Sequence, residues 1–223
     1  MSGQASMSER AYASLKQDIL QCRLRPGEVI MDGWLAEQYG MSRTPIREAM
    51  NALRREGLVV VIPRRGTFVK AVDIGELQDT YRMRAILEPE AAVLASQRAT
   101  PDELDALAEL SDSTVRAEDG PAARNEANRL FHVRIAELAR IPLMIQSINS
   151  LHEEIERFLN LQGALGNPYT ATNHHRLVDM LRTESADEIR AVVLSGIEKA
   201  RTHMIETLLA QSDLPGPRTD SSI

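Results

Sequence analysis

The spacing of hydrophobic residues predicts three short helices at the start of the chain. Apolar side chains recur every three to four residues from about Ser8 to Cys22, again from Asp32 to Gly40, and from Ser42 to Gly57. The turn signal Arg25-Pro26-Gly27 separates the first two helices, and Ser42 is a suitable N-terminal cap for the third.

The following residues change from helical spacing to short runs rich in β-branched side chains. Leu58 to Ile62 and Thr67 to Lys70 flank a turn at Pro63-Arg64-Arg65-Gly66, which predicts a two-stranded hairpin. Three helices followed by a hairpin is the order of elements in a winged helix-turn-helix. We therefore expect residues 1–72 to form a DNA-binding domain of this kind.

From Asp73 onward every segment has helical spacing, and we expect no further strand. Asp73 is a predicted cap, and Thr100 with Glu103 forms a predicted capping box. The fold class is thus mostly α, with residues 73–212 forming an antiparallel helical bundle and residues 213–223 a flexible tail. The predicted bundle helices span about 73–98, 100–118, 122–140, 142–162, 171–183 and 186–210.

The formal net charge of −6 conceals an uneven distribution along the chain. Residues 1–70 hold 11 Lys and Arg against 7 Asp and Glu, whereas the remaining residues hold 15 against 25. A basic first domain suits a nucleic-acid partner. The longest apolar run, Leu58 to Ile62, is too short to cross a membrane, and the polar first residues do not resemble a signal peptide. We expect a cytoplasmic protein with no membrane partner.

Cys22 is the single cysteine of the chain, so no internal disulfide can form. Its apolar neighbours at helical spacing predict a position in the core rather than any thiol chemistry.

Candidate DNA-binding residues gather on the predicted third helix and in the hairpin turn. On the helix they occupy the face opposite Ile46, Met50 and Leu53, where arginine can bind guanine or phosphate. A single exposed arginine is equally well explained as a solvated charge, but the group as a whole favours one docking mode in the major groove. The candidates are Arg43, Thr44, Arg47, Asn51 and Arg54 on the helix, and Arg64, Arg65 and Gly66 in the turn.

Two stretches of the chain resemble known families. The segment from Leu35 to Ala49, LAEQYGMSRTPIREA, closely resembles the winged helix of GntR-family transcriptional regulators. Tyr81 to Glu88 (YRMRAILE) and Asn128 to His132 (NRLFH) resemble the all-helical FCD effector domain of the FadR subfamily. The resemblance implies a homodimer, a double-stranded operator with two half-sites, and control of DNA binding by a small metabolite.

The resemblance also implies that Arg43, Thr44, Arg47 and Gly66 approach DNA. Gly33 stands where an arginine at the start of the second helix is common in the family, so one contact with DNA is expected to be missing.

The bundle carries candidate effector-binding residues. Arg84 and Glu88 lie on an apolar stripe and are expected to point inward, the alternative being an exposed salt bridge between positions i and i+4. An inward arginine needs an anion, which Glu88 supplies in part and a carboxylate effector would complete. Asn128, His132 and His174 lie on apolar faces of other helices. The predicted effector is a small organic anion held by these five residues.

Many FCD domains hold a divalent metal with one Asp and three His, so the resemblance raises the question of a metal here. Asn128 and Gly196 stand at two of those four positions, and His132 and His174 stand at the other two, with His175 as the neighbouring alternative to His174. We therefore expect no required metal, and only His132 and His174 as weak candidate ligands.

Three further residues of the bundle are notable. Gly196 lies within a predicted helix, where glycine is unfavourable, and is expected to make room for an effector or a neighbouring helix. His152 and His203 match no motif, and we expect them at the surface or in a dimer interface.

The sequence predicts a DNA-binding transcriptional regulator, specifically a repressor, controlled by a carboxylate effector. One alternative is an all-helical metal-dependent enzyme using His132 and His174, but no nucleophile with its base, phosphate loop or full metal set can be assembled. Another is a DNA-binding protein whose bundle is occluded and does not respond to an effector.

Overall fold

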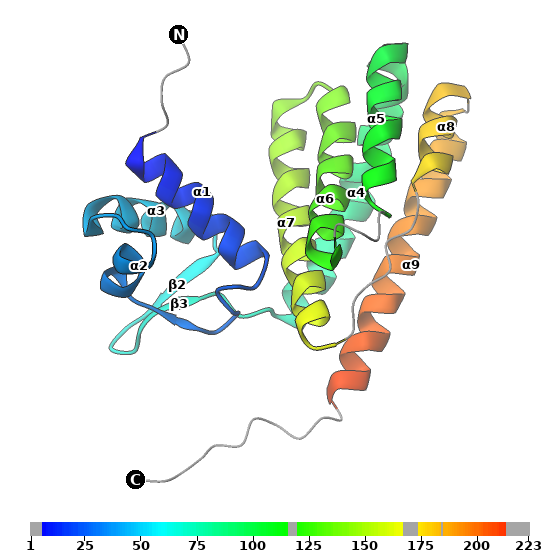
Figure 1. Cartoon of the computed structure of the whole chain (residues 1–223). Helices are drawn as coiled ribbons and strands as arrows, with labels where there is room; N and C mark the ends of the chain where they lie inside the picture. The colour runs from blue at the N-terminus through cyan, green and yellow to red at the C-terminus, as the bar shows by residue number, and fades with distance from the viewer. Residues whose placement is uncertain (1–5, 116–119, 167–173, 184, 213–223) are drawn as a thin grey trace.

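The computed structural model describes residues 6–115, 120–166, 174–183 and 185–212, which form an N-terminal unit and a helical bundle (Figure 1). Each part has its own hydrophobic core, one running from Ala11 to Val69 in the sequence and the other from Leu77 to Met204. The tail predicted at 213–223 lies outside the described residues.

The N-terminal unit contains three helices and three strands. Ser6 and Glu9 form a capping box at the start of the first helix, because each side chain bonds the other's backbone N–H. The core is built by the apolar faces of the helices, including the fully buried Leu15, Leu35 and Ile46. The elements are α1 (Met7–Leu20), β1 (Val29–Ile30), α2 (Asp32–Gln38), α3 (Arg43–Arg55), β2 (Val59–Ile62) and β3 (Gly66–Val69).

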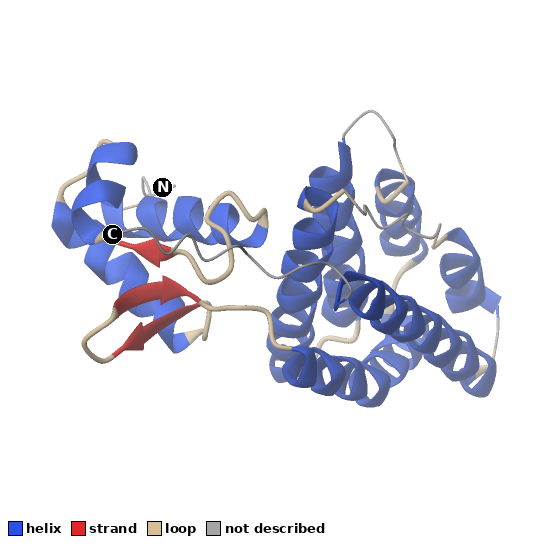
Figure 2. Cartoon of the chain, turned by 90° about the horizontal axis from the view of Figure 1, so that it is seen from below, coloured by secondary structure: helices blue, strands red, loops and turns tan. Residues whose placement is uncertain are grey.

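The sheet has one strand more than the predicted hairpin. β2 and β3 pair antiparallel, with Val61 opposite Thr67, and β1 joins the other edge of β3, with Val29 opposite Phe68. Figure 2 places all three strands beside the N-terminal helices. The two residues of β1 are too few for sequence alternation to reveal a strand, which is why the pattern predicted only the hairpin.

Six helices form the bundle in the described part of the chain. The predicted caps are confirmed at two of them: Asp73 accepts a bond from the N–H of Glu76, and Thr100 forms the capping box with Glu103. Ser42 does precede α3, but its side chain makes no capping bond. The bundle helices are α4 (Ile74–Arg98), α5 (Pro101–Ser113), α6 (Gly120–Leu138), α7 (Pro142–Ala164), α8 (His175–Thr183) and α9 (Ala186–Ser212).

A polar contact joins α7 to the N-terminal unit. Arg157, fully buried, donates from Nη1 to the backbone oxygen of Lys70 at 2.7 Å. Asn160 Nδ2 donates to the backbone oxygen of Leu20 at 2.9 Å. Cys22 is buried as predicted, although it follows α1 rather than lying within it, and its thiol donates to the backbone oxygen of Arg157. These bonds tie the bundle to the first domain through one helix.

Among the residues that the structure describes, none of the helices is both long and apolar enough to span a membrane.

Candidate DNA-binding surface and effector cavity

The helix α3 presents its predicted DNA-binding residues to solvent. Arg43, Thr44, Arg47, Asn51 and Arg54 are all exposed, while Ile46, Met50 and Leu53 on the opposite face are buried. This division follows from the helical repeat, because the apolar stripe must face the core.

Two of the arginines on α3 lie against the start of α2. Arg47 Nε is 2.5 Å from Asp32 Oδ2, and its side chain remains 62% exposed, so the ion pair orients the guanidinium without burying it. The guanidinium of Arg43 lies over Gly33, where a Cβ atom would come within 3.3 Å of it. The glycine that replaces the expected arginine therefore gives Arg43 room to lie across the first turn of α2.

The end of the hairpin exposes Arg64 and Arg65 in the turn and Gly66 at the start of β3. Gly66 has a φ of +119°, a conformation that glycine adopts easily and other residues rarely adopt. The guanidinium carbon of Arg65 lies 6.0 Å from the ring centre of Phe68 on the following strand. Two positive charges thus stand at the tip of the hairpin.

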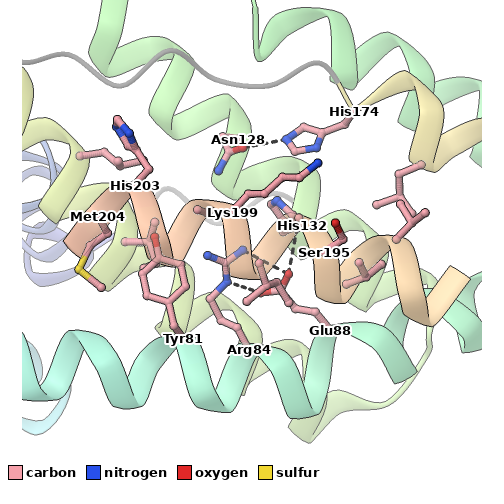
Figure 3. Close-up of a pocket in the computed structure, with 18 of the residues that line it drawn as sticks. Tyr81, Arg84, Glu88, Asn128, His132, His174, Ser195, Lys199, His203 and Met204 are labelled. Atoms are coloured by element: carbon pink, nitrogen blue, oxygen red, sulfur yellow. Dashed lines mark hydrogen bonds and ion pairs between the residues drawn. The ribbon is translucent and has the colours of Figure 1, made fainter. Parts of the chain in front are cut away.

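The bundle contains a cavity of about 360 Å³, a size typical of small-molecule sites (Figure 3). Residues of α4, α6, α7, α8 and α9 line it. The five predicted effector-binding residues, Arg84, Glu88, Asn128, His132 and His174, are all brought together there. Much of the remaining wall is apolar and comes from α7 and α9, including Ile155, Phe158, Leu159, Val193 and Ile197.

Arg84 and Glu88 point inward, and both are only 5% exposed. Arg84 Nε is 2.5 Å from Glu88 Oε1, so the two side chains form a buried ion pair and not the exposed i,i+4 salt bridge that was the alternative. The guanidinium also lies over the ring of Tyr81, 5.1 Å from its centre. Two histidines also contact the Glu88 carboxylate. His152 Nε2 lies 2.8 Å from Oε1, and His132 Nδ1 lies 3.3 Å from Oε2.

Burial determines the charge of this cluster. It lowers the pKa of His132 to about 4 and that of His174 to about 3, and it also lowers the pKa of His152. Burial is the largest influence on Glu88 and alone would raise its pKa, but Arg84, His152 and His132 together outweigh it and hold that pKa well below its usual range. At neutral pH the cluster is one ion pair surrounded by neutral imidazoles.

His174 and Lys199 lie on another wall of the cavity. His174 Nε2 donates to Asn128 Oδ1 at 2.9 Å, and its ring stacks on Phe131 with 4.4 Å between ring centres. Lys199 on α9 lines the cavity and points into it on the side of His174 (Figure 3). Lys199 makes no hydrogen bond or ion pair with any residue that the structure describes. Its ammonium is therefore available to an anion.

The prediction for His152 was wrong. This side chain is 1% exposed and belongs to the cluster around Glu88. It continues the buried stripe of α7 that contains Ile148, Ile155 and Leu159, and this spacing was the signal that could have located it. His203 is exposed, as expected, but it also lines the cavity.

Lys199 was likewise missed, although it follows Gly196 by three residues and therefore lies on the same side of α9. Gly196 itself lines the cavity, and among the described residues nothing lies within 4 Å of where its Cβ would be. Of the two reasons expected for this glycine, close packing of a neighbouring helix is not seen within the described part of the chain, and room for an effector stays a prediction.

The cluster offers atoms of the kind that bind metals but does not suit a divalent ion. Glu88, His132 and His152 place three ligand-type atoms within 4.8 Å of one another. The same carboxylate is already paired with Arg84, whose positive charge opposes a dication. On the wall of His174, the neutral Asn128 and the side-chain-free Gly196 leave too few ligands. These residues do not fit a tightly held metal.

Comparisons with known proteins find matches for both the N-terminal unit and the helical bundle. Residues 7–69 match the family model of bacterial regulatory proteins of the gntR family, and residues 79–199 match the FCD domain. The Nta operon transcriptional regulator of Aminobacter aminovorans is 32% identical over 187 residues, which cover 82% of this chain and 88% of that protein. The HTH-type transcriptional repressor RspR of Escherichia coli (strain K12) is 22% identical over 207 residues, covering 92% and 85% of the two chains.

Among solved structures, E. coli McbR/YncC matches with a TM-score of 0.77 and 27% sequence identity, covering 94% of this chain and 100% of that one. A winged helix-turn-helix followed by an FCD bundle defines a class of DNA-binding transcriptional regulators. The chain belongs to the GntR family of bacterial regulatory proteins and carries an FCD domain. Its relatives are regulators and not enzymes, so the alternative of a metal-dependent enzyme is wrong.

Proposed function

We propose that this regulator is a homodimeric, cytoplasmic repressor whose affinity for operator DNA is controlled by a small organic anion bound in the bundle. The observation that carries the proposal is the cavity, in which an apolar wall meets a cluster of polar side chains and a lysine unpaired among the described residues. The cavity argues against the alternative of an occluded bundle that does not respond to an effector. The role as a repressor is supported by the similarity to RspR, which is named as one.

The anion would bind where positive charge and hydrogen-bond donors meet. Arg84 supplies a guanidinium whose charge Glu88 partly neutralises. Lys199 supplies a second positive charge, and this lysine has no carboxylate partner in the described part of the chain. His132, His174 and Asn128 add polar groups. All three are uncharged at pH 7, because burial lowers the pKa of both histidines well below 7. A carboxylate held by these groups would place its hydrocarbon part against the apolar wall.

The DNA would be bound by the exposed residues of α3 and the hairpin. Arg43, Thr44, Arg47, Asn51 and Arg54 would enter the major groove, and Arg64, Arg65 and Gly66 would approach the flanking groove or backbone. Two half-sites require two copies of the domain, which is the reason for proposing a homodimer.

One helix offers a physical connection between the two sites. Phe158 and Leu159 on α7 line the cavity, whereas Arg157 and Asn160 of the same turn bond the N-terminal unit. A ligand that favours one position of α7 over another would change how the winged helix is held. Such control requires different affinities for the ligand in the DNA-bound and the free protein.

The response of DNA binding to organic acids tests the proposal. Duplexes selected from a random pool by the full-length protein provide a DNA probe, and fluorescence anisotropy then measures its affinity in the presence of hexanoate, octanoate, succinate or adipate. At least one of these acids should weaken binding by tenfold or more. If none of them changes the affinity, effector control by an organic anion is refuted.

Variants locate the site. Lys199→Met and Arg84→Ala should bind DNA normally without acid and lose the response to it. Arg82→Ala is the matched control, because Arg82 is an exposed arginine on the same helix as Arg84 and pairs with Asp79. Lys199→Met is the safer variant for folding because its side chain is exposed. A full response in both variants would place the effector site elsewhere.

A further inference from the structure

Gln162, near the end of α7, is a buried residue of the cavity whose amide makes no hydrogen bond with the described residues. Its side chain is 1% exposed and lines the cavity. Neither Nε2 nor Oε1 has a hydrogen-bond partner among the residues that the structure describes. Buried amides are nearly always bonded, because leaving one unpaired costs free energy. Such a side chain therefore points to a partner that comes from outside the protein.

A nearby amide in the same helix shows the usual situation. Asn160 is also buried, and both ends of its amide are used: Oδ1 accepts from Asn125 Nδ2 at 2.8 Å, and Nδ2 donates to the backbone oxygen of Leu20 at 2.9 Å. The neighbouring buried amide of α7 thus has both ends bonded, whereas neither end of the Gln162 amide is bonded within the described part of the chain.

Gln162 is distant along the helix from the charged cluster. α7 runs antiparallel to α4, because His152 contacts Glu88 whereas Arg157, further along α7, contacts Lys70 before α4 begins. Gln162 follows His152 by ten residues, or about 15 Å at 1.5 Å per residue. On α7, Phe158 and Leu159 lie between Gln162 and the charged cluster, and both line the cavity.

We propose that Gln162 selects the effector by bonding an uncharged polar group at the end of the ligand opposite its carboxylate. A primary amide offers N–H donors and a carbonyl acceptor and is neutral, so it matches a hydroxyl or an amide better than a second anion. The effector class that follows is an elongated acid with a carboxylate at one end, an apolar middle and a hydroxyl or amide at the other end. This inference rests on the proposed function, because it concerns the same cavity.

The position of Gln162 also bears on control. It lies two residues after Asn160, whose bond to Leu20 joins the bundle to the N-terminal unit. A ligand reaching Gln162 would occupy the end of the cavity near this contact, whereas a shorter acid would fill only the charged region. Ligands long enough to reach Gln162 should therefore release the protein from DNA more effectively than short acids.

The test compares Gln162→Met with Gln146→Met, a matched control because Gln146 is an exposed residue of the same helix. Methionine keeps the length of the side chain but removes the amide. Melting without ligand gives the first readout: Gln162→Met should melt at the same temperature as the wild type or higher, because no internal bond is lost. A lower melting temperature than that of Gln146→Met would show that the amide is structural and would overturn the inference.

The second readout uses hexanoate and octanoate beside 6-hydroxyhexanoate and 8-hydroxyoctanoate, with Kd measured by calorimetry. The wild type should bind one hydroxy acid at least about tenfold more tightly than its parent acid, since a site built to bond a hydroxyl discriminates against its absence. Gln162→Met should lose this preference and still bind the parent acid, whereas Gln146→Met should keep it. If the acids bind the wild type without preference for the hydroxyl, only this inference fails. If none of these four acids binds, and succinate and adipate do not bind either, the proposed function fails with it.

Discussion

Acidification should destabilise the bundle through its buried histidines, and the direction follows from their pKa values. In the unfolded chain a histidine titrates near pH 6.5, whereas His132 and His174 in the folded protein titrate near 4 and 3 because of burial. Between these values the unfolded state binds more protons than the folded state. The free energy of unfolding must therefore fall as the pH drops below about 6.5.

The size of the effect can be worked out for each group. Each pKa unit corresponds to slightly more than 1 kcal/mol, so each of the two histidines should remove about 1 kcal/mol between pH 6.5 and 5.5. His152 acts in the same direction. Glu156 opposes them: burial raises its pKa to about 7 despite its contact with Arg129, so its protonation below pH 7 favours the folded state. The Glu156→Gln variant removes this opposing contribution.

Urea denaturation followed by circular dichroism at pH 7.0, 6.5, 6.0 and 5.5 measures the slope. In a Glu156→Gln background, adding His132→Asn should reduce the loss of stability between pH 6.5 and 5.5 by about 1 kcal/mol. His203→Asn is the control, because that histidine is exposed. An equal pH slope with and without His132 would refute the burial argument for this cluster.

Three other predictions concern DNA binding, assembly and metal. Arg47→Ala should weaken operator binding by about 1–3 kcal/mol if the guanidinium binds a base, while Arg82→Ala should not; unchanged affinity by anisotropy would remove Arg47 from the interface. Sedimentation equilibrium of the full chain at micromolar concentration should give a dimer, and a monomer would contradict the proposed two-fold assembly. Elemental analysis should find far less than one metal per chain in the wild type. Joint Asn128→Asp and Gly196→His substitutions should create a zinc or nickel site, and failure to gain metal would mean that other features of the cavity prevent binding.

Much of the fold could be predicted because its causes are local. The caps at Asp73 and Thr100 and the helical spacing between them lie within a few residues, so the sequence reveals them directly. The short strand β1 could not be predicted, since it exists only by pairing with Phe68 and Thr67 far along the chain. Both ends of α6 and the end of α7 differ from those predicted by about two residues, and α5 ends at Ser113 rather than near residue 118, as expected when helix ends depend on tertiary packing.

The cavity was predictable in part for the same reason. Arg84 and Glu88 could be placed inside from their own helix, because a charge on an apolar stripe stands out. The apolar stripe of α7 could have placed His152 inside in the same way, but it could not assign a role to Gln162 or Lys199. Their significance depends on what faces them from other helices, and a buried but unpaired amide looks like any other glutamine in a sequence.

The most direct test of the central claim is the thermodynamic linkage between the cavity and the DNA. Calorimetry would measure the Kd of 6-hydroxyhexanoate, or of whichever acid of the panel binds best, for the free protein and for its complex with the selected operator. Linkage requires the ratio of these two Kd values to equal the ratio of operator affinities without and with saturating acid. We predict that the acid binds the free protein at least tenfold more tightly than the DNA complex. Equal affinity for both forms would contradict effector control.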